Sequence, residues 1–161
     1  MSLRTLIQQG RKVTSIGESP VATLLMRMIV SFVFVSEGIQ KFLFSESLGV
    51  GRFIKIGIPM PQIMAPFVGV VEIVCGTLVL AGLFTRLAAI PLIIDMLVAI
   101  STTKIPMLFE KGFWAMAHEA RTDWSMLLGA IFLLLIGAGR WSLDGINAQK
   151  SPGHAQRGNE D

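Results

Sequence analysis

Redox-active and metal-binding side chains are scarce in this sequence. Its 161 residues include one cysteine, Cys75, and two histidines, His118 and His154. A single cysteine excludes an intrachain disulfide and a CxxC redox pair. Both histidines lie outside the long apolar segments, which excludes a haem held by two histidines across a helix bundle. The chain therefore shows no electron carrier of its own, and electrons would have to come from a bound ligand or a partner subunit.

Charged residues are also few. They make up 16% of the chain, whereas 52% of the residues are hydrophobic and the mean hydropathy is +0.64. A soluble domain of this length would carry more charge. The formal net charge is +3, but the basic residues are scattered over loops and termini, which argues against a nucleic-acid partner. The expected partner is a lipid bilayer, since a mild basic excess in a membrane protein usually reflects its topology.

Four apolar segments are long enough to cross a bilayer as helices. They cover residues 21–44, 62–84, 87–103 and 124–141. Only Thr85 and Arg86 separate the second segment from the third, which predicts an antiparallel helical hairpin. The sequence thus predicts an all-α fold, a four-helix transmembrane bundle with a polar interior.

The remaining segments suggest a simple domain organisation. We expect a cytoplasmic tail at 1–20, the membrane domain at 21–145 and a disordered cytoplasmic tail at 146–161. The first apolar segment is too long for a signal-peptide core, so it is expected to be retained. Residues 45–61 and 104–123 are expected to be loops, the second with a short helix on the membrane surface. The distribution of lysine and arginine slightly favours cytoplasmic termini in a multi-pass protein of the plasma membrane, the inner membrane of a bacterium.

Acidic side chains lie inside three of the four apolar segments, at Glu37, Glu72 and Asp95. A carboxylate at the bilayer centre costs roughly 2.5–3.5 kcal/mol on insertion scales, so such groups must be paired, protonated or used. Helical phase places Arg27 and Lys41 on the same face as Glu37. Glu37 and Lys41 are four residues apart, which predicts an ion pair near the outer end of the bundle.

Glu72 and Asp95 are expected to face each other near mid-membrane, because they lie at similar depths in the antiparallel hairpin. We expect Arg27 to join them in an interior cluster. Two acids beside one arginine predict that one acid is neutral at pH 7, which suits proton exchange or a hydrogen bond to a polar ligand. A purely structural role stays open, since polar contacts between membrane helices contribute about 0.6 kcal/mol on average.

Three further candidates, His118, Glu119 and Asp123, lie at helical spacing near the predicted outer mouth. Such a set has the right side chains for a metal. Loop residues of this kind are more often solvated, however, and we predict no metal site. Cys75 is expected to be a small packing residue rather than a redox group.

Several motifs, taken in order along residues 22–145, resemble those of the DoxX family of small four-helix membrane proteins. They are Gly38-Ile-Gln-Lys41-Phe42, Gly57-Ile-Pro59-Met-Pro61, Glu72 followed by Gly76, Gly82-Leu-Phe-Thr85-Arg86, and Gly137-Ala-Gly139-Arg140-Trp-Ser142-Leu143-Asp144. One departure is Asp123 at the opening of the fourth segment, where similar proteins commonly have glutamate. The charge at this position is kept.

The resemblance implies a fold and a location more than an activity. Similar proteins include subunits associated with quinone-linked sulfur oxidation and with membrane complexes that answer oxidative stress, and others resemble membrane chaperones or cargo receptors. The leading expectation is a redox-associated subunit that binds a quinone or similar lipid-soluble ligand and has no covalently bound cofactor. Its partner would be a redox or other membrane protein, or a second copy of the chain.

In this hypothesis Glu72 and Asp95 exchange protons with the ligand or form hydrogen bonds to it, and Arg27 balances their charge. The chain would then be at most one subunit of an oxidoreductase. The main alternative is a non-enzymatic membrane chaperone or assembly factor. A small-solute transporter is less favoured, because four spans leave little room for a pathway.

Overall fold

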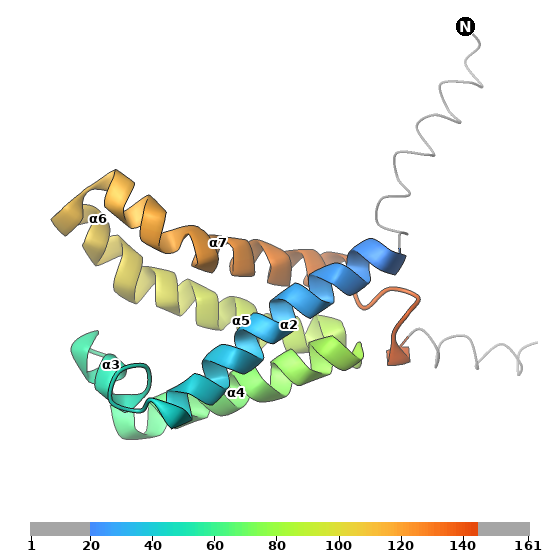
Figure 1. Cartoon of the computed structure of the whole chain (residues 1–161), viewed down its shortest axis with the longest axis horizontal. Helices are drawn as coiled ribbons and strands as arrows, with labels where there is room; N and C mark the ends of the chain where they lie inside the picture. Colours follow the sequence, from blue (N-terminus) through green and yellow to red (C-terminus); the bar gives the residue numbers. More distant parts are fainter. Residues whose placement is uncertain (1–19, 145–161) are drawn as a thin grey trace, which may run out of the picture.

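The computed structural model describes residues 20–144, which form helices joined by short turns and contain no strand (Figure 1). The all-α prediction is therefore confirmed for this part of the chain. The predicted tails lie almost entirely outside the described residues. The helices are α2 (Pro20–Leu43), α3 (Val50–Lys55), α4 (Pro61–Ala81), α5 (Thr85–Ala99), the π-helical segment η2 (Ile100–Lys104), α6 (Ile105–Lys111) and α7 (Phe113–Ile136).

Three helical segments among the described residues are long and apolar enough to cross a bilayer. They are α2, α4 and the run from α5 through α6, residues Thr85–Lys111. The fourth long helix, α7, has 24 residues and packs against α5 and α2. Its first half carries Glu119, Arg121 and Asp123, so this helix is not as uniformly apolar as the other three segments. A membrane crossing by α7 stays a prediction.

The long helices associate mainly in two pairs. The most extensive contacts are between α2 and α4 and between α5 and α7, and the two pairs separate from right to left in Figure 1. The α4–α5 turn, the start of α2 and the end of α7 lie together at the right. We call this end, with residues 137–144, the capped end.

The two expected loops are more helical than predicted, because the first contains a helix and the second holds more than the single short helix that was expected. The short helix α3 lies within residues 45–61, and residues 104–123 are almost entirely helical. In the second case α6 follows η2 directly, and the chain then reverses at Gly112, which has a φ of +81°. Pro106 does not break this run, because it falls in the first turn of α6, where a backbone donor is not needed.

Small residues bring α2 and α4 into close contact. A methyl group at Gly38 would lie 2.7 Å from the carbonyl oxygen of Gly69 and 3.1 Å from Cβ of Glu72. Small residues at such an interface let the backbones of two membrane helices approach closely. This approach carries the last turn of α2, which contains Lys41, to the side of α4 that bears Glu72.

A buried arginine holds the capped end together. Arg27 is 2% exposed, and its guanidinium donates hydrogen bonds to four backbone carbonyls. Nε donates to Val79 (2.9 Å), Nη2 to Leu80 (2.5 Å), and Nη1 to Ala138 (3.2 Å) and Trp141 (2.6 Å). The first two carbonyls belong to the last turn of α4, where backbone donors are scarce, and the carbonyl of Val79 also accepts a hydrogen bond from the N–H of Gly82 at 3.1 Å. One side chain thus caps α4 and ties it to the segment after α7.

Two more side chains cap helices at this end. The carboxylate of Asp144 accepts hydrogen bonds from the backbone N–H groups of Phe84 (3.1 Å) and Thr85 (3.4 Å), as an N-cap does for α5. Nη2 of Arg86 donates to the carbonyl of Leu135 near the end of α7, at 3.1 Å. The Gly82–Arg86 and Gly137–Asp144 motifs therefore build helix ends.

Replacing Arg27 with methionine would keep the length of the side chain and remove all four hydrogen bonds. We expect the free energy of unfolding to fall by at least about 3 kcal/mol, because each unsatisfied buried carbonyl costs about 1–3 kcal/mol. Arg27→Lys should restore part of the loss. Unfolding of the full chain in detergent measures the effect. Arg140→Met, which removes an exposed base at the same end, is the control, and equal losses in the two methionine variants would contradict this role of Arg27.

Candidate binding site

A buried polar site forms where α2, α4 and α5 meet. Nζ of Lys41 lies 2.6 Å from Oε2 of Glu72, and the two side chains are 12% and 2% exposed. A charge-assisted hydrogen bond this short, removed from water, is among the stronger polar contacts in proteins. Lys41 also lies in the last turn of α2, where a positive charge is favourable beside the free carbonyls of the helix.

Asp95 brings a second carboxyl group to this site from α5. The carboxyl groups of Asp95 and Glu72 are close enough to form a hydrogen bond when one of them is protonated, and both lie within electrostatic range of Lys41. When both are ionised, Oδ2 of Asp95 is buried and has no hydrogen-bond partner among residues 20–144. Burying such an acceptor without a donor is costly. The buried polar site, which we define as Lys41, Glu72 and Asp95, therefore holds one unsatisfied acceptor.

The structure places Arg27 away from this site, so the expected cluster of Arg27 with Glu72 and Asp95 is wrong. The four carbonyls at the capped end hold its guanidinium. The guanidinium of Arg27 and the carboxylate of Glu72 lie at different depths. Val79, which accepts a hydrogen bond from Arg27, is seven residues beyond Glu72 in α4, or about 10 Å along the helix. The free carbonyls of a helix end are nearer to Arg27 than the carboxylates are.

The predicted ion pair between Glu37 and Lys41 is also absent. Glu37 is exposed and forms no ion pair with the described residues, whereas Lys41 bonds to Glu72. Spacing along one helix indicated only Glu37 as a partner for Lys41, because Glu72 lies on another helix. Burial decides between them, because an exposed pair four residues apart contributes only about 0.2–0.5 kcal/mol, while a buried carboxylate without a cation is very unfavourable. Glu37 still lies within electrostatic range of Asp95.

A second ion pair was missed by the sequence analysis. Nζ of Lys104 lies 3.1 Å from Oδ2 of Asp123, and Lys104 is buried, at 8% exposed. Lys104 ends the η2 segment, and Asp123 lies within electrostatic range of Asp95. Polar groups thus continue from the buried polar site toward the α6–α7 turn. A signal was present, because Lys104 follows the third apolar segment and Asp123 precedes the fourth, which gives them the same depth in antiparallel helices.

The outer-mouth candidates do not come together. His118 and Glu119 are exposed on α7, and Asp123 is engaged by Lys104. Across residues 20–144, no three side chains of histidine, cysteine, aspartate or glutamate form a group suited to a metal ion. Cys75 is a half-buried free cysteine that packs against the apolar core.

The chemistry available to the buried polar site follows from its charges. It contains one ammonium group and two carboxyl groups in apolar surroundings, with Oδ2 of Asp95 unpaired. The ammonium has three donors, of which one is used by Glu72. The site can therefore donate a hydrogen bond to a carbonyl oxygen, accept one from a hydroxyl group and exchange a proton with either.

Comparison with known proteins places the chain in a family. The family model DoxX matches residues 22–105. An uncharacterized membrane protein of Mycobacterium tuberculosis is 58% identical over 134 residues, which cover 80% of this chain and 82% of that protein. "Putative oxidoreductase CatD" of Bacillus subtilis is 32% identical over 77% of this chain and 85% of its own length.

A third relative is an uncharacterized protein of Haemophilus influenzae. It is 31% identical, over 78% of this chain and 90% of that protein. No solved structure matches the chain significantly.

The substitution Asp95→Asn tests whether the carboxylate of Asp95 stabilises the fold. We expect the free energy of unfolding to stay the same or to rise by up to about 1 kcal/mol, because Oδ2 loses no protein donor. Lys41→Met leaves Glu72 buried without its cation and should cost about 3–5 kcal/mol. Unfolding in detergent measures both. A loss in Asp95→Asn as large as that in Lys41→Met would show that Asp95 is a structural group.

Proposed function

Because this chain belongs to the DoxX family of membrane proteins, we propose that it is a redox-associated subunit that binds a quinone or similar lipid-soluble ligand. The ligand would lie at the buried polar site. The observation that carries the proposal is the buried Oδ2 of Asp95, which has no partner among the described residues. CatD, a relative at 32% identity, is named as a putative oxidoreductase, which supports the same class.

A quinone and its quinol suit the hydrogen-bonding groups of this site. A quinol hydroxyl would donate to Oδ2 of Asp95, and a quinone carbonyl would accept from a free donor on Nζ of Lys41. Oxidation of the quinol releases two protons and two electrons. The carboxyl groups of Asp95 and Glu72 would accept protons, and the electrons would pass to a partner protein, since the chain shows no carrier of its own.

The proposed arrangement in the membrane follows from the positions of the helix ends. All four long helices, α7 included, would cross a bacterial inner membrane, with the capped end and both termini on the cytoplasmic side. The charged first half of α7 is compatible with this, because Lys104 pairs with Asp123 and leaves neither charge alone in the apolar region. The partner that accepts the electrons would be a redox protein of the same membrane, because a second copy of this chain would bring no electron carrier.

One observation favours a second candidate, a membrane assembly factor. Ser36 and Glu37 are exposed on α2, and Nε2 of Gln40 donates to Oγ of Ser36 at 2.9 Å. Polar groups on the outer surface of a membrane helix are suited to hydrogen bonding with a neighbouring helix. In this alternative the ligand is another protein segment, and the quinone is absent.

Quinone binding is tested by extracting the full chain gently, measuring the quinone that copurifies, and titrating the emptied protein with a short-chain quinone. We expect the wild-type chain to retain quinone and Asp95→Asn to bind it about tenfold more weakly, the loss of roughly one hydrogen bond to a charged group. Glu46→Gln, which removes an exposed carboxylate outside the site, should bind as the wild type does.

Equal binding by Asp95→Asn and Glu46→Gln would reject the proposed site. The absence of quinone, together with a protein that copurifies in mild detergent and is lost in Glu37→Ala, would favour the assembly factor.

A further inference from the structure

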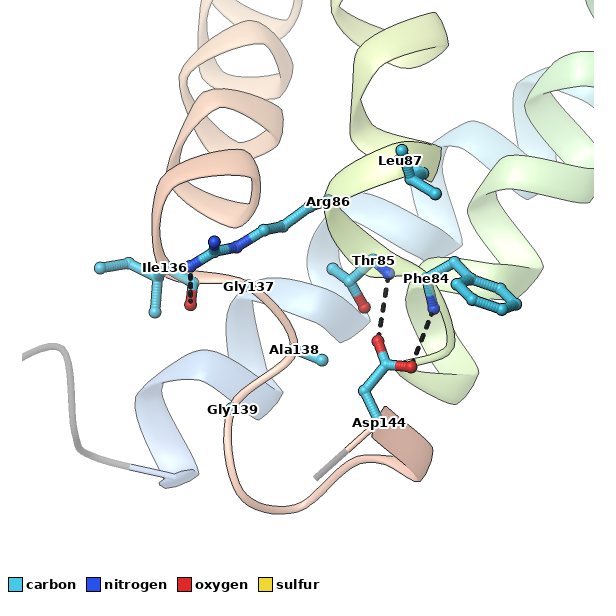
Figure 2. A pocket seen from close by; sticks show the side chains of 9 residues that line it. All are labelled: Phe84, Thr85, Arg86, Leu87, Ile136, Gly137, Ala138, Gly139 and Asp144. Atoms are coloured by element: carbon cyan, nitrogen blue, oxygen red, sulfur yellow. Dashed lines mark hydrogen bonds between the residues drawn. The ribbon is translucent and has the colours of Figure 1, made fainter. Parts of the chain in front are cut away.

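A cavity lies at the capped end, apart from the buried polar site. Its volume is about 420 Å³, and it lies between the start of α5 and the segment that follows α7 (Figure 2). Asp95 is ten residues farther along α5 than Thr85, or about 15 Å. The cavity is within the size range of small-molecule sites, roughly 300–1,000 Å³.

Two polar side chains that line this cavity have unused hydrogen-bonding capacity. Oγ1 of Thr85 is buried, in a residue that is 1% exposed, and has no partner among residues 20–144. Arg86 uses only Nη2, toward the carbonyls of Leu135 and Ile136 at 3.1 and 3.5 Å, so Nε and Nη1 make no hydrogen bond within the described chain. A hydroxyl group and a guanidinium therefore remain for a ligand.

The third polar group is the carboxylate of Asp144. It accepts hydrogen bonds from Phe84 and Thr85, so the chain itself already occupies the N-terminus of α5 (Figure 2). Arg86 and Asp144 both line the cavity without forming an ion pair with each other. The cavity thus presents one positive and one negative group, and the buried guanidinium of Arg27 also lies within electrostatic range of Asp144. A ligand that carries both a phosphate and an ammonium group has a partner of opposite charge for each of the two lining groups.

The position of the cavity narrows the ligand further. It lies where α5 begins and α7 ends, and the ends of membrane-spanning helices lie at the headgroup region. Phe84 and Leu87, at its edge, are 60% and 64% exposed, which gives an apolar surface for an acyl chain beside the polar groups. Arginine is well suited to phosphate because its guanidinium can donate two parallel hydrogen bonds.

We propose that this cavity binds the headgroup of a zwitterionic phospholipid that carries a primary ammonium group. The phosphate accepts hydrogen bonds from Arg86 and from the hydroxyl of Thr85. The ammonium lies toward Asp144, and the acyl chains lie against Leu87 and Phe84. This site does not depend on quinone binding, because it shares no residue with the buried polar site.

Native mass spectrometry of the full chain in detergent tests the proposal with two lipids, phosphatidylethanolamine and phosphatidylglycerol. We expect the wild-type chain to retain phosphatidylethanolamine several-fold more than phosphatidylglycerol. Arg86→Gln should lower this retention about tenfold, the effect of losing charge-assisted hydrogen bonds to phosphate. Arg140→Gln, which removes an exposed charge at the same end but does not line the cavity, should leave retention unchanged.

Thr85→Val provides a second variant that is expected to fold. It keeps the shape of the side chain and removes a hydroxyl that has no protein partner, so the unfolding temperature should not fall while lipid retention falls several-fold. Equal retention by Arg86→Gln and Arg140→Gln, or unchanged retention in Thr85→Val, would overturn the proposal. Equal retention of the two lipids, or inorganic phosphate that displaces the bound lipid at millimolar concentration, would also overturn it.

Discussion

A bilayer offers no water to charged groups or to backbone carbonyls, so each of them needs a partner inside the protein. Two cations on α2 meet this requirement at different depths. Arg27 caps the end of α4 and binds the segment after α7 through four carbonyls, and Lys41 neutralises the buried carboxylate of Glu72. Because both cations reach α4, the close packing of α2 on α4 underlies the rest of the fold.

The capped end and the buried polar site therefore differ in how completely their polar groups are paired. At the capped end, Arg27 and Asp144 complete the ends of α4 and α5, and the unused capacity belongs to Thr85 and Arg86 at the edge of a cavity. In the interior, two carboxyl groups share one ammonium, and Oδ2 of Asp95 is unpaired. A buried polar group without a partner lowers the stability of the fold, so its presence needs another explanation. Binding of a ligand is such an explanation at both places.

The motifs that resemble those of the family fall into two groups, one at the buried polar site and one at the capped end. Gly38, Lys41 and Glu72 place a charged pair at a tight helix contact, whereas the Gly82–Arg86 and Gly137–Asp144 motifs build helix ends. A shared motif in this family is therefore not in itself a sign of chemistry. The relatives do not assign a chemistry to these motifs. The relative at 58% identity is an uncharacterized membrane protein, and the name of CatD describes CatD alone.

Composition and periodicity were sufficient to predict an all-α membrane protein, the approximate bounds of α2 and α4, and the short turn between α4 and α5. These features depend on local hydrophobicity and on the length of each segment, which a single sequence displays directly. The same information placed Glu72 and Asp95 at a similar depth. It did not predict that residues 104–123 are almost entirely helical, because a proline and a mixture of charged and aromatic side chains resemble a loop in the sequence.

Only the packing of the helices decided which charges meet. Spacing along one helix made Glu37 the expected partner of Lys41, and helical phase made Arg27 a plausible partner for Glu72 and Asp95. The outcome depended on rotation and depth, which no single segment encodes. The close contact of α2 and α4 at Gly38 and Gly69 places Lys41 beside Glu72. Arg27 instead forms hydrogen bonds with carbonyls of α4 and of the segment after α7, because a buried charge must be paired with groups within its reach.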